Sequence, residues 1–246
     1  MADNIEIREC TTLDELAECV TVQRDVFALP EQELSPVRHF VVTKNAGGFT
    51  LAAFENGRMA GFVLSIPAFL RGERALYSHM TGVRPEYQSL GLGARLKWAQ
   101  REQALARGVK HIKWTFEPVK ARNAYFNLEK LGATVREYQA NFYGTDYGTA
   151  NGFGLASDRL IAEWDLESDK VVMLSNGADF DGPPKPTAEI TIMNDWSALV
   201  SKSPGEAHAE QLRVRGEFQT AFEQDLIVRG FRRSDDDPAY LLYQNV

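Results

Sequence analysis

The residues best suited to chemistry form a glycine-rich turn, Gln88-Ser89-Leu90-Gly91-Leu92-Gly93, between a strand-like run and a strongly helical one. The first backbone N–H groups of a helix have no intrahelical partners. Together with the positive end of the helix dipole, they form a binding site for phosphate. Gly91 and Gly93 have no side chains that would keep a phosphate away from the backbone. The pattern therefore predicts a phosphate-binding turn.

Two elements must position this turn. Ala75–Val83 reads as the strand before it, and the helix begins at Leu92 and ends before Gly108, a typical residue just past a helix C-terminus. The helical pattern places Leu96 on an apolar face and Lys97 on the opposite, polar face.

The periodicity around these elements predicts strand, helix, helix, three strands, helix, strand, helix and strand over residues 5–143. Thr12 and Glu15 have the spacing of a capping box, and Asn56-Gly57 is a strong hairpin signal. We therefore expect a mixed α/β fold whose first half is antiparallel, with a helical crossover in the middle.

The chain changes character after Gly144. We expect a domain over residues 1–144, a connecting loop, strand and Pro-rich linker over 145–187, and a C-terminal extension over 188–246. The extension reads as a strand, a long helix that opens at Ser203 and runs to Gly230, and a hairpin. It could extend the sheet, cover a cleft or form a homodimer contact.

Composition excludes several classes of function. The net charge is −7, and residues 145–246 carry 18 acidic and 9 basic residues, against 16 and 18 in residues 1–144. An acidic chain without a basic stripe argues against a nucleic-acid partner. No run approaches the ~18–20 apolar residues of a membrane span, so no membrane partner is expected.

The cysteines, histidines and N-terminus bear on location and metals. The first residues are polar and acidic, so no signal peptide is expected. Cys10 and Cys19 are interpreted as small apolar residues in a reducing cytoplasm, with a disulfide left open. His111 and His208 lack partners at metal-ligand spacing, so no metal site is expected.

At this point the sequence resembles the GNAT (GCN5-related) N-acetyltransferase superfamily, and within it a branch of predicted acetyltransferases with a C-terminal extension. The turn at Gln88–Gly93 matches the family's (Arg/Gln)-x-x-Gly-x-(Gly/Ala) motif for the pyrophosphate of acyl-CoA. The strand ending Thr81-Gly82-Val83, the helix after the turn, and the later segment from Asn123 to Leu131-Gly132 follow in the family's order. The resemblance covers roughly residues 5–143 and implies the GNAT fold, a central mixed, mostly antiparallel sheet flanked by helices.

The resemblance also implies how coenzyme A binds. Backbone groups around Thr81, Gly82 and Val83 would pair with the pantetheine arm as an added strand does. The N–H groups of Leu90–Ala94, which include those of Gly91, Leu92 and Gly93, would hold the pyrophosphate, beside Gln88 and Ser89. Asn123, with Tyr125 or Phe126, would line the far side of the coenzyme A.

Two residues are candidates for the general base that deprotonates the acceptor amine. His79 belongs to the strand that would flank the acyl group, and Glu117 ends the next strand. Each could equally be a structural residue, a hydrogen-bonded histidine or a solvated carboxylate. Many family members have a tyrosine that protonates the leaving thiolate, but the matching position here is Leu128, so this role is not carried over.

The sequence thus predicts a cytoplasmic transferase: an acyl-CoA-dependent N-acyltransferase that moves acetyl from acetyl-CoA to a small amine or amino acid. Two alternatives stay open. The donor could be a larger thioester such as succinyl-CoA, or the chain could be an inactive sensor that binds coenzyme A without turnover.

Overall fold

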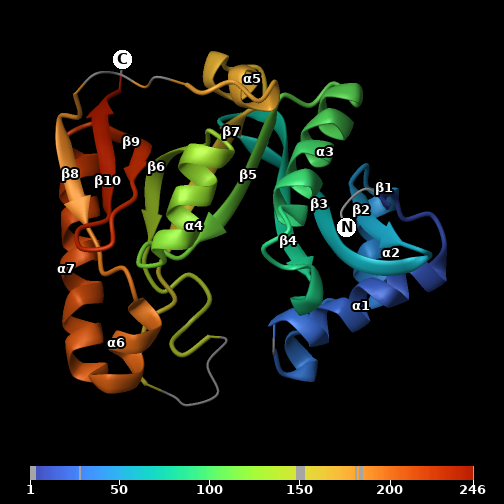
Figure 1. Cartoon of the computed structure of the whole chain (residues 1–246), viewed down its shortest axis with the longest axis horizontal. Helices are drawn as coiled ribbons and strands as arrows, with labels where there is room; N and C mark the ends of the chain where they lie inside the picture. The colour runs from blue at the N-terminus through green and yellow to red at the C-terminus, as the bar shows by residue number, and fades with distance from the viewer. Residues whose placement is uncertain (1–3, 28, 148–152, 181, 183–184, 246) are drawn as a thin grey trace. The chain divides into compact units, whose positions relative to one another are not determined.

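A computed structural model describes residues 4–27, 29–147, 153–180, 182 and 185–245. The chain divides into two compact units, Met1–Lys113 and Trp114–Val246, and each is described by itself (Figure 1). The predicted boundaries after residues 144 and 187 remain predictions.

The first unit is a sheet with helices on both faces. The strand order is β1-β2-β3-β4, all antiparallel, and β5 then joins β4 in parallel through the pairs Leu76–Ile112 and Tyr77–Lys113. Its elements are β1 (Ile5–Glu9), α1 (Leu13–Phe27), α2 (Val37–Asn45), β2 (Phe49–Glu55), β3 (Arg58–Leu70), β4 (Glu73–Val83), α3 (Leu92–Ala106) and the start of β5 (His111–Phe116), with short 3-10 turns at Glu31–Glu33 and Pro85–Tyr87.

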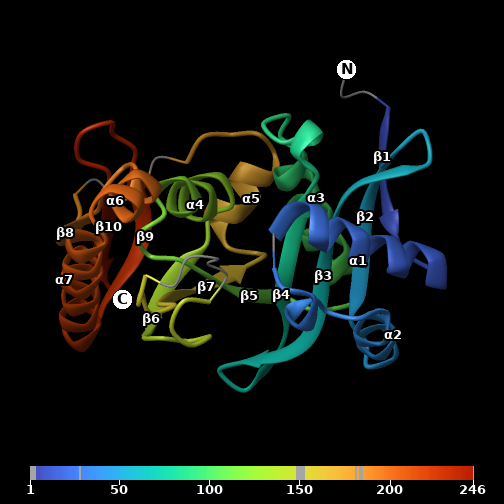
Figure 2. The ribbon, with the colours of Figure 1, turned by 90° about the horizontal axis from the view of Figure 1, so that it is seen from below.

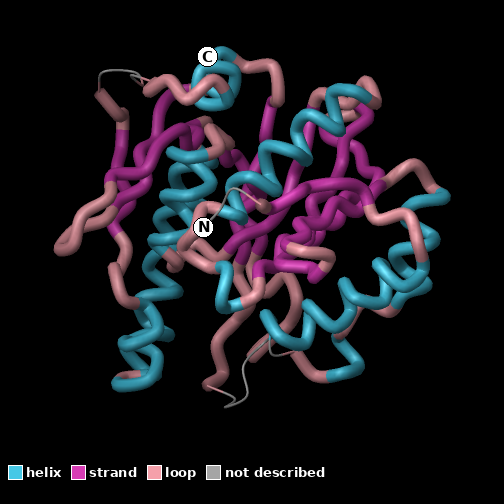
Figure 3. The backbone as a smooth tube through the Cα atoms, turned by 45° about the vertical axis from the view of Figure 1, so that its right-hand side comes forward, coloured by secondary structure: helices cyan, strands magenta, loops and turns pink. Residues whose placement is uncertain are grey.

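Strand alternation assigns the two faces of this sheet. Phe62 and Leu64 on β3 belong to a buried cluster with residues of α1 and α2, whereas Ser65, one position on, accepts a hydrogen bond from Gln100 of α3. Successive side chains of a strand point to opposite faces, so α1 and α2 cover one face and α3 the other. Figure 2 shows α1 in front of β2 and β3, and Figure 3 shows cyan helices on either side of the magenta strands.

The local signals of the sequence are reproduced in this unit. Glu15 N–H donates to Thr12 Oγ1 at 3.2 Å, and Thr12 N–H donates to the Glu15 carboxylate at 3.1 Å, which is the reciprocal capping box. Asn56 and Gly57 both have positive φ, +50° and +81°, as a two-residue hairpin turn requires.

The second unit contains most of the remaining elements. Its strand order is β5-β7-β6-β9-β10-β8. The elements are α4 (Ala121–Tyr125), a π-helical turn (Phe126–Lys130), β6 (Thr134–Gln139), β7 (Arg159–Asp165), α5 (Asp169–Ser175), β8 (Ala188–Thr191), α6 (Trp196–Lys202), α7 (Pro204–Glu223), β9 (Leu226–Arg232) and β10 (Ala239–Gln244).

The C-terminal strands continue the sheet of the second unit. β9 pairs with β6 at Val135–Val228, and β10 joins β9 to β8, all antiparallel. On α7, the buried Phe218 ring lies 5.7 Å from Tyr138 of β6 and 5.0 Å from Tyr240 of β10. Extension of the sheet, one of the three roles considered for this segment, is therefore what the structure shows.

The mixed α/β fold with a mostly antiparallel sheet flanked by helices is confirmed. The extent of the long C-terminal helix is corrected: it ends at Glu223 rather than Gly230. Asp225 has a φ of +56°, which a right-handed helix cannot contain, and the apolar run Leu226–Val228 begins a buried strand instead. The short helix α5 was not expected from the sequence.

A buried carboxylate fastens α7 to the loop that leads into β7. The Asp158 side chain has no exposed surface. It accepts two hydrogen bonds from the Arg215 guanidinium, each at 2.9 Å, one from Tyr138 Oη at 2.5 Å, and one from Asn141 N–H at 2.9 Å. Four donors on one carboxylate compensate for its removal from water.

Replacing Arg215 should therefore destabilise the protein strongly. Arg215→Met leaves the buried Asp158 carboxylate without its cation, and we expect a loss of about 3–5 kcal/mol in the free energy of unfolding. The matched control is Arg213→Met, two residues earlier on α7, whose ion pairs with Glu210 and Glu217 are partly exposed and worth about 1 kcal/mol or less. Urea denaturation measures both, and equal losses would contradict this account.

Candidate functional site

The glycine turn begins α3 with a left-handed residue. Gly91 is the N-cap and has φ +75°, and the helix starts at Leu92. Arg95 N–H donates to Gly91 C=O at 3.1 Å, which closes the first turn. The N–H groups of Leu92, Gly93 and Ala94 precede that bond, so helix geometry leaves them without intrahelical acceptors.

The space beside the two glycines of the turn is open. A Cβ atom added to Gly91 or Gly93 would meet none of the described neighbouring atoms within 4 Å. Ser89, Leu90 and Gly91 are exposed, and Gln88 is held back by a 3.0 Å bond from its Nε2 to Val83 C=O. Donors at a helix N-terminus that have no intrahelical acceptor suit an anion, so the turn fits the predicted pyrophosphate.

The strand before the turn is irregular at His79. Leu64 pairs with Met80 and Ser65 pairs with Ser78, so His79 is the extra residue of a β-bulge between β3 and β4. A bulge re-aims the side chains around it and is common beside active sites. The recorded pairs between β4 and β5 involve Leu76 and Tyr77, which precede the bulge, and Thr81 and Val83 lie beyond it.

His79 is half-buried beside Ser35 and beside His39 of α2. Its Nε2 is 3.4 Å from Ser35 Oγ, and its ring is 5.5 Å from the His39 ring. Burial, and secondarily the positive charge that His39 can carry, lower the pKa of His79 to about 4. His79 is therefore neutral at pH 7.

Lys97 is where the sequence interpretation was wrong. It was placed on the polar face of α3, but it is buried. Its Nζ donates to Gln100 Oε1 at 2.7 Å and to Ser78 Oγ at 3.0 Å, and Gln100 in turn donates to Ser65 Oγ at 2.8 Å. This network lies between α3 and the sheet, and burial lowers the pKa of Lys97 well below its usual value.

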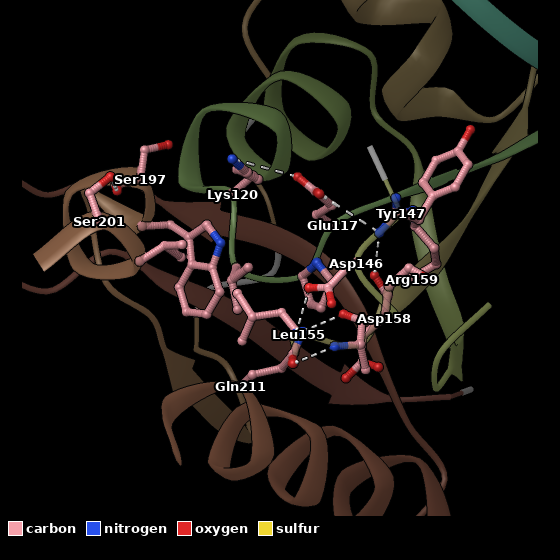
Figure 4. Close-up of a pocket in the computed structure, with 16 residues that line it drawn as sticks. Glu117, Lys120, Asp146, Tyr147, Leu155, Asp158, Arg159, Ser197, Ser201 and Gln211 are labelled. Atoms are coloured by element: carbon pink, nitrogen blue, oxygen red, sulfur yellow. Dashed lines mark hydrogen bonds and ion pairs between the residues drawn. The ribbon is translucent and has the colours of Figure 1, made fainter. Parts of the chain in front are cut away.

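In the second unit, Glu117 lines a cavity of about 220 Å³. Glu117 follows β5, and its carboxylate lies between Lys120 Nζ and Arg159 Nη1, 3.8 Å from each (Figure 4). Trp196 and Val200 of α6 line the same cavity. The lining of this cavity therefore includes both a predicted catalytic residue, Glu117, and residues of the C-terminal extension.

Residues 12–133 match the model of the acetyltransferase (GNAT) family. The chain carries an acetyltransferase domain of the GNAT family. No curated protein matches the sequence. Among solved structures, the ribosomal-protein-S18-alanine N-acetyltransferase from Escherichia coli is 20% identical, with 67% of this chain and 95% of that chain covered and a TM-score of 0.53. A GNAT acetyltransferase from Elizabethkingia anophelis with acetyl-CoA bound is 17% identical, with 67% and 99% covered and a TM-score of 0.51.

A GNAT acetyltransferase from Streptococcus pneumoniae is 20% identical, with 65% of this chain and 97% of that chain covered and a TM-score of 0.51. At these identities the likeness to solved structures shows the fold. Within the described part of the chain, no helix has the length and apolar character needed to cross a membrane.

The remaining GNAT motif positions lie on α4 and the π-helical turn. Asn123 is exposed, and Tyr125 and Phe126 are half-buried. Leu131 N–H donates to Phe126 C=O at 3.1 Å, which is the i to i−5 hydrogen bond of a π-helix. The α-helical spacing of the sequence does not predict this bond. Leu128, at the position of the family's frequent tyrosine, is completely buried, so it packs in the core.

Each unit thus contains part of the predicted set of site residues. The first brings His79, Thr81, Gly82 and Val83 into the segment that leads to the turn at Gln88–Ala94. The second contains Glu117, Asn123, Tyr125 and Phe126. Sequence reasoning missed Lys120, Arg159 and Trp196 beside Glu117; they lie up to 79 positions away along the chain, and no motif connects them.

The lowered pKa of His79 predicts a pH dependence of stability. An unfolded chain binds a proton at this histidine near pH 6.5, but the native state does so only near pH 4. Stability should therefore fall as the pH falls from about 7 to 4, by up to about 3 kcal/mol for this group.

Urea denaturation at pH 7 and pH 4.5 should show a smaller fall for His79→Asn than for the wild type. The control is His208→Asn, which removes an exposed histidine of α7 and should reproduce the wild-type fall. Identical pH dependence of all three proteins would contradict the assignment.

Proposed function

We propose that this chain is an acyl-CoA-dependent N-acyltransferase that transfers acetyl from acetyl-CoA to a small amine or amino acid by direct attack. The observation that carries the proposal is the left-handed Gly91 in front of the open first turn of α3, at the position of the GNAT pyrophosphate motif. The match of residues 12–133 to the acetyltransferase family supports it.

For the donor, we assign the pyrophosphate to the N–H groups of Leu90–Ala94. The backbone of Thr81–Val83 follows the bulge at His79, and we assign it to the pantetheine amides. The exposure of Asn123 and the partial exposure of Tyr125 and Phe126 suit contacts with the rest of the coenzyme.

The reaction needs one base and little acid help. The amine nitrogen forms a bond to the thioester carbonyl carbon, the carbon–sulfur bond breaks, and the proton lost by the amine goes to a protein base. A thiol ordinarily has a pKa near 8.5, so the leaving thiolate needs little assistance. A buried Leu128 where many relatives have tyrosine is therefore compatible with turnover.

Between the two candidate bases, the environment favours Glu117. A general base must reach the amine that it deprotonates, and His79 Nε2 already lies 3.4 Å from Ser35 Oγ with its ring against His39. Glu117 is partly exposed and borders a cavity, where a substrate could reach it. We therefore assign the base to Glu117 and a positioning role to His79.

The acceptor is small in this proposal. The cavity beside Glu117, about 220 Å³, is below the ~300–1,000 Å³ of pockets that hold drug-sized ligands, which favours a small amine or amino acid over a folded protein. Cys10 and Cys19 are buried free thiols, which supports a reducing, cytoplasmic location.

Binding of coenzyme A should depend on Gly93. The substitution Gly93→Glu adds a carboxylate in front of the α3 N–H groups without backbone strain, because φ at Gly93 is not positive. We expect the Kd for coenzyme A, measured by calorimetry, to rise about tenfold or more.

The matched control is Gly205→Glu. Gly205 is likewise the second residue of a helix, α7, and a Cβ there also meets open space. It should leave the Kd unchanged. A wild-type protein that binds no coenzyme A, or a Gly93→Glu variant that binds it normally, would refute the assignment of the donor site.

A further inference from the structure

The cavity beside Glu117 is lined by side chains of opposite charge and by apolar side chains, Leu155, Trp196 and Val200 among them; Figure 4 shows the charged groups. We propose that it binds a free α-amino acid with an apolar side chain, held by its carboxylate between Lys120 and Arg159 and by its ammonium at Glu117. This inference rests on the proposed function, in which the bound amino acid would be the acceptor of the acetyl group.

The charged groups are suited to a zwitterion. Lys120 and Arg159 share the single carboxylate of Glu117, and both N–O separations are 3.8 Å. Charge-assisted hydrogen bonds close at about 2.7–2.9 Å, so Glu117 engages neither cation tightly. Asp146 lines the same cavity, so Lys120, Arg159, Glu117 and Asp146 together carry no net charge. A zwitterion keeps this balance, with its carboxylate at the two cations and its ammonium at Glu117.

Arg159 is held in place for this role. Its side chain is only 10% exposed, Nη1 donates to Asp158 C=O at 2.8 Å, and the guanidinium lies over the Tyr143 ring at 5.1 Å. The neighbouring Asp158 carboxylate does not compete for this cation, because Arg215 neutralises it. A pre-positioned guanidinium loses little entropy when it binds a carboxylate.

Part of the cavity lining comes from the C-terminal extension. Trp196 and Val200 of α6 line the cavity together with Leu155, which precedes β7. Gln211 of α7 holds this segment through Ala156, with Nε2 donating to its C=O at 2.7 Å and Oε1 accepting from its N–H at 3.3 Å. An apolar side chain would be removed from water there, at about 25 cal/mol for each Å² buried.

The position of α6 beside the cavity gives the C-terminal extension a role in the proposed binding of the amino acid. Its strands continue the sheet of the second unit, and α6, with Gln211 of α7, supplies part of the cavity lining. Substrate selection by side-chain size would then be set in part by residues outside the matched family segment, 12–133.

The test is a calorimetric titration of the full chain, without any acyl donor, with L-leucine, L-methionine and L-phenylalanine, and with isoamylamine as leucine without its carboxylate. We expect at least one amino acid to bind, and isoamylamine to bind at least about tenfold more weakly than leucine. Lys120→Gln and Arg159→Gln should each raise the Kd for the amino acid about tenfold and should not raise that for isoamylamine, because the ammonium loses a neighbouring like charge.

Lys202→Gln is the control, since it removes an exposed lysine of α6 outside the cavity, and it should bind as the wild type does. Lys120 is partly exposed, so its variant keeps the test decisive should Arg159→Gln fail to fold. Absence of binding by all three amino acids, or equal binding of leucine and isoamylamine, would overturn the inference. Acetylation of amines without a carboxylate would then still uphold the proposed function.

Discussion

The backbone conformation of Gly91 is the constraint on which the proposed donor site depends. At φ +75° a residue with a side chain would be strained. Gly91 is the N-cap of α3, so the segment that follows β4 turns into the helix at this residue. The consequence is a helix whose first N–H groups have no intrahelical acceptors, with open space where a Cβ of Gly91 or Gly93 would lie. The bulge at His79 and the network of Lys97, Ser78 and Gln100 fix the strand and helix on either side of the turn.

A second constraint acts in the other unit, where a carboxylate is removed completely from water. The cost of burying the Asp158 carboxylate is offset by the hydrogen bonds that Arg215 and Tyr138 donate to it. Because Arg215 belongs to α7, the ion pair also connects α7 to the segment that contains Arg159. The C-terminal extension is consequently part of the same packed unit as Glu117, and its helix α6 borders the cavity. Fold and proposed acceptor recognition therefore depend on one buried ion pair.

Local signals made much of the fold predictable. The capping box of Thr12 and Glu15, the Asn56-Gly57 hairpin and the glycine turn act over a few residues, and each formed as expected. Lys97 was misplaced because a helical pattern does not reveal a buried polar network. The end of α7 and the cavity around Glu117 depend on contacts between distant segments, such as β9 with β6, which local periodicity does not encode.

The measurement that tests the central claim most directly is the detection of an N-acetylated product by mass spectrometry. Wild-type protein is incubated with acetyl-CoA and a mixture of small amines and amino acids, and free thiol is followed in parallel. We predict thiol release matched mole for mole by an N-acetylated product, and a rate at least about a hundredfold lower for Glu117→Gln. Binding of acetyl-CoA with no product from any amine would contradict the account and indicate a sensor.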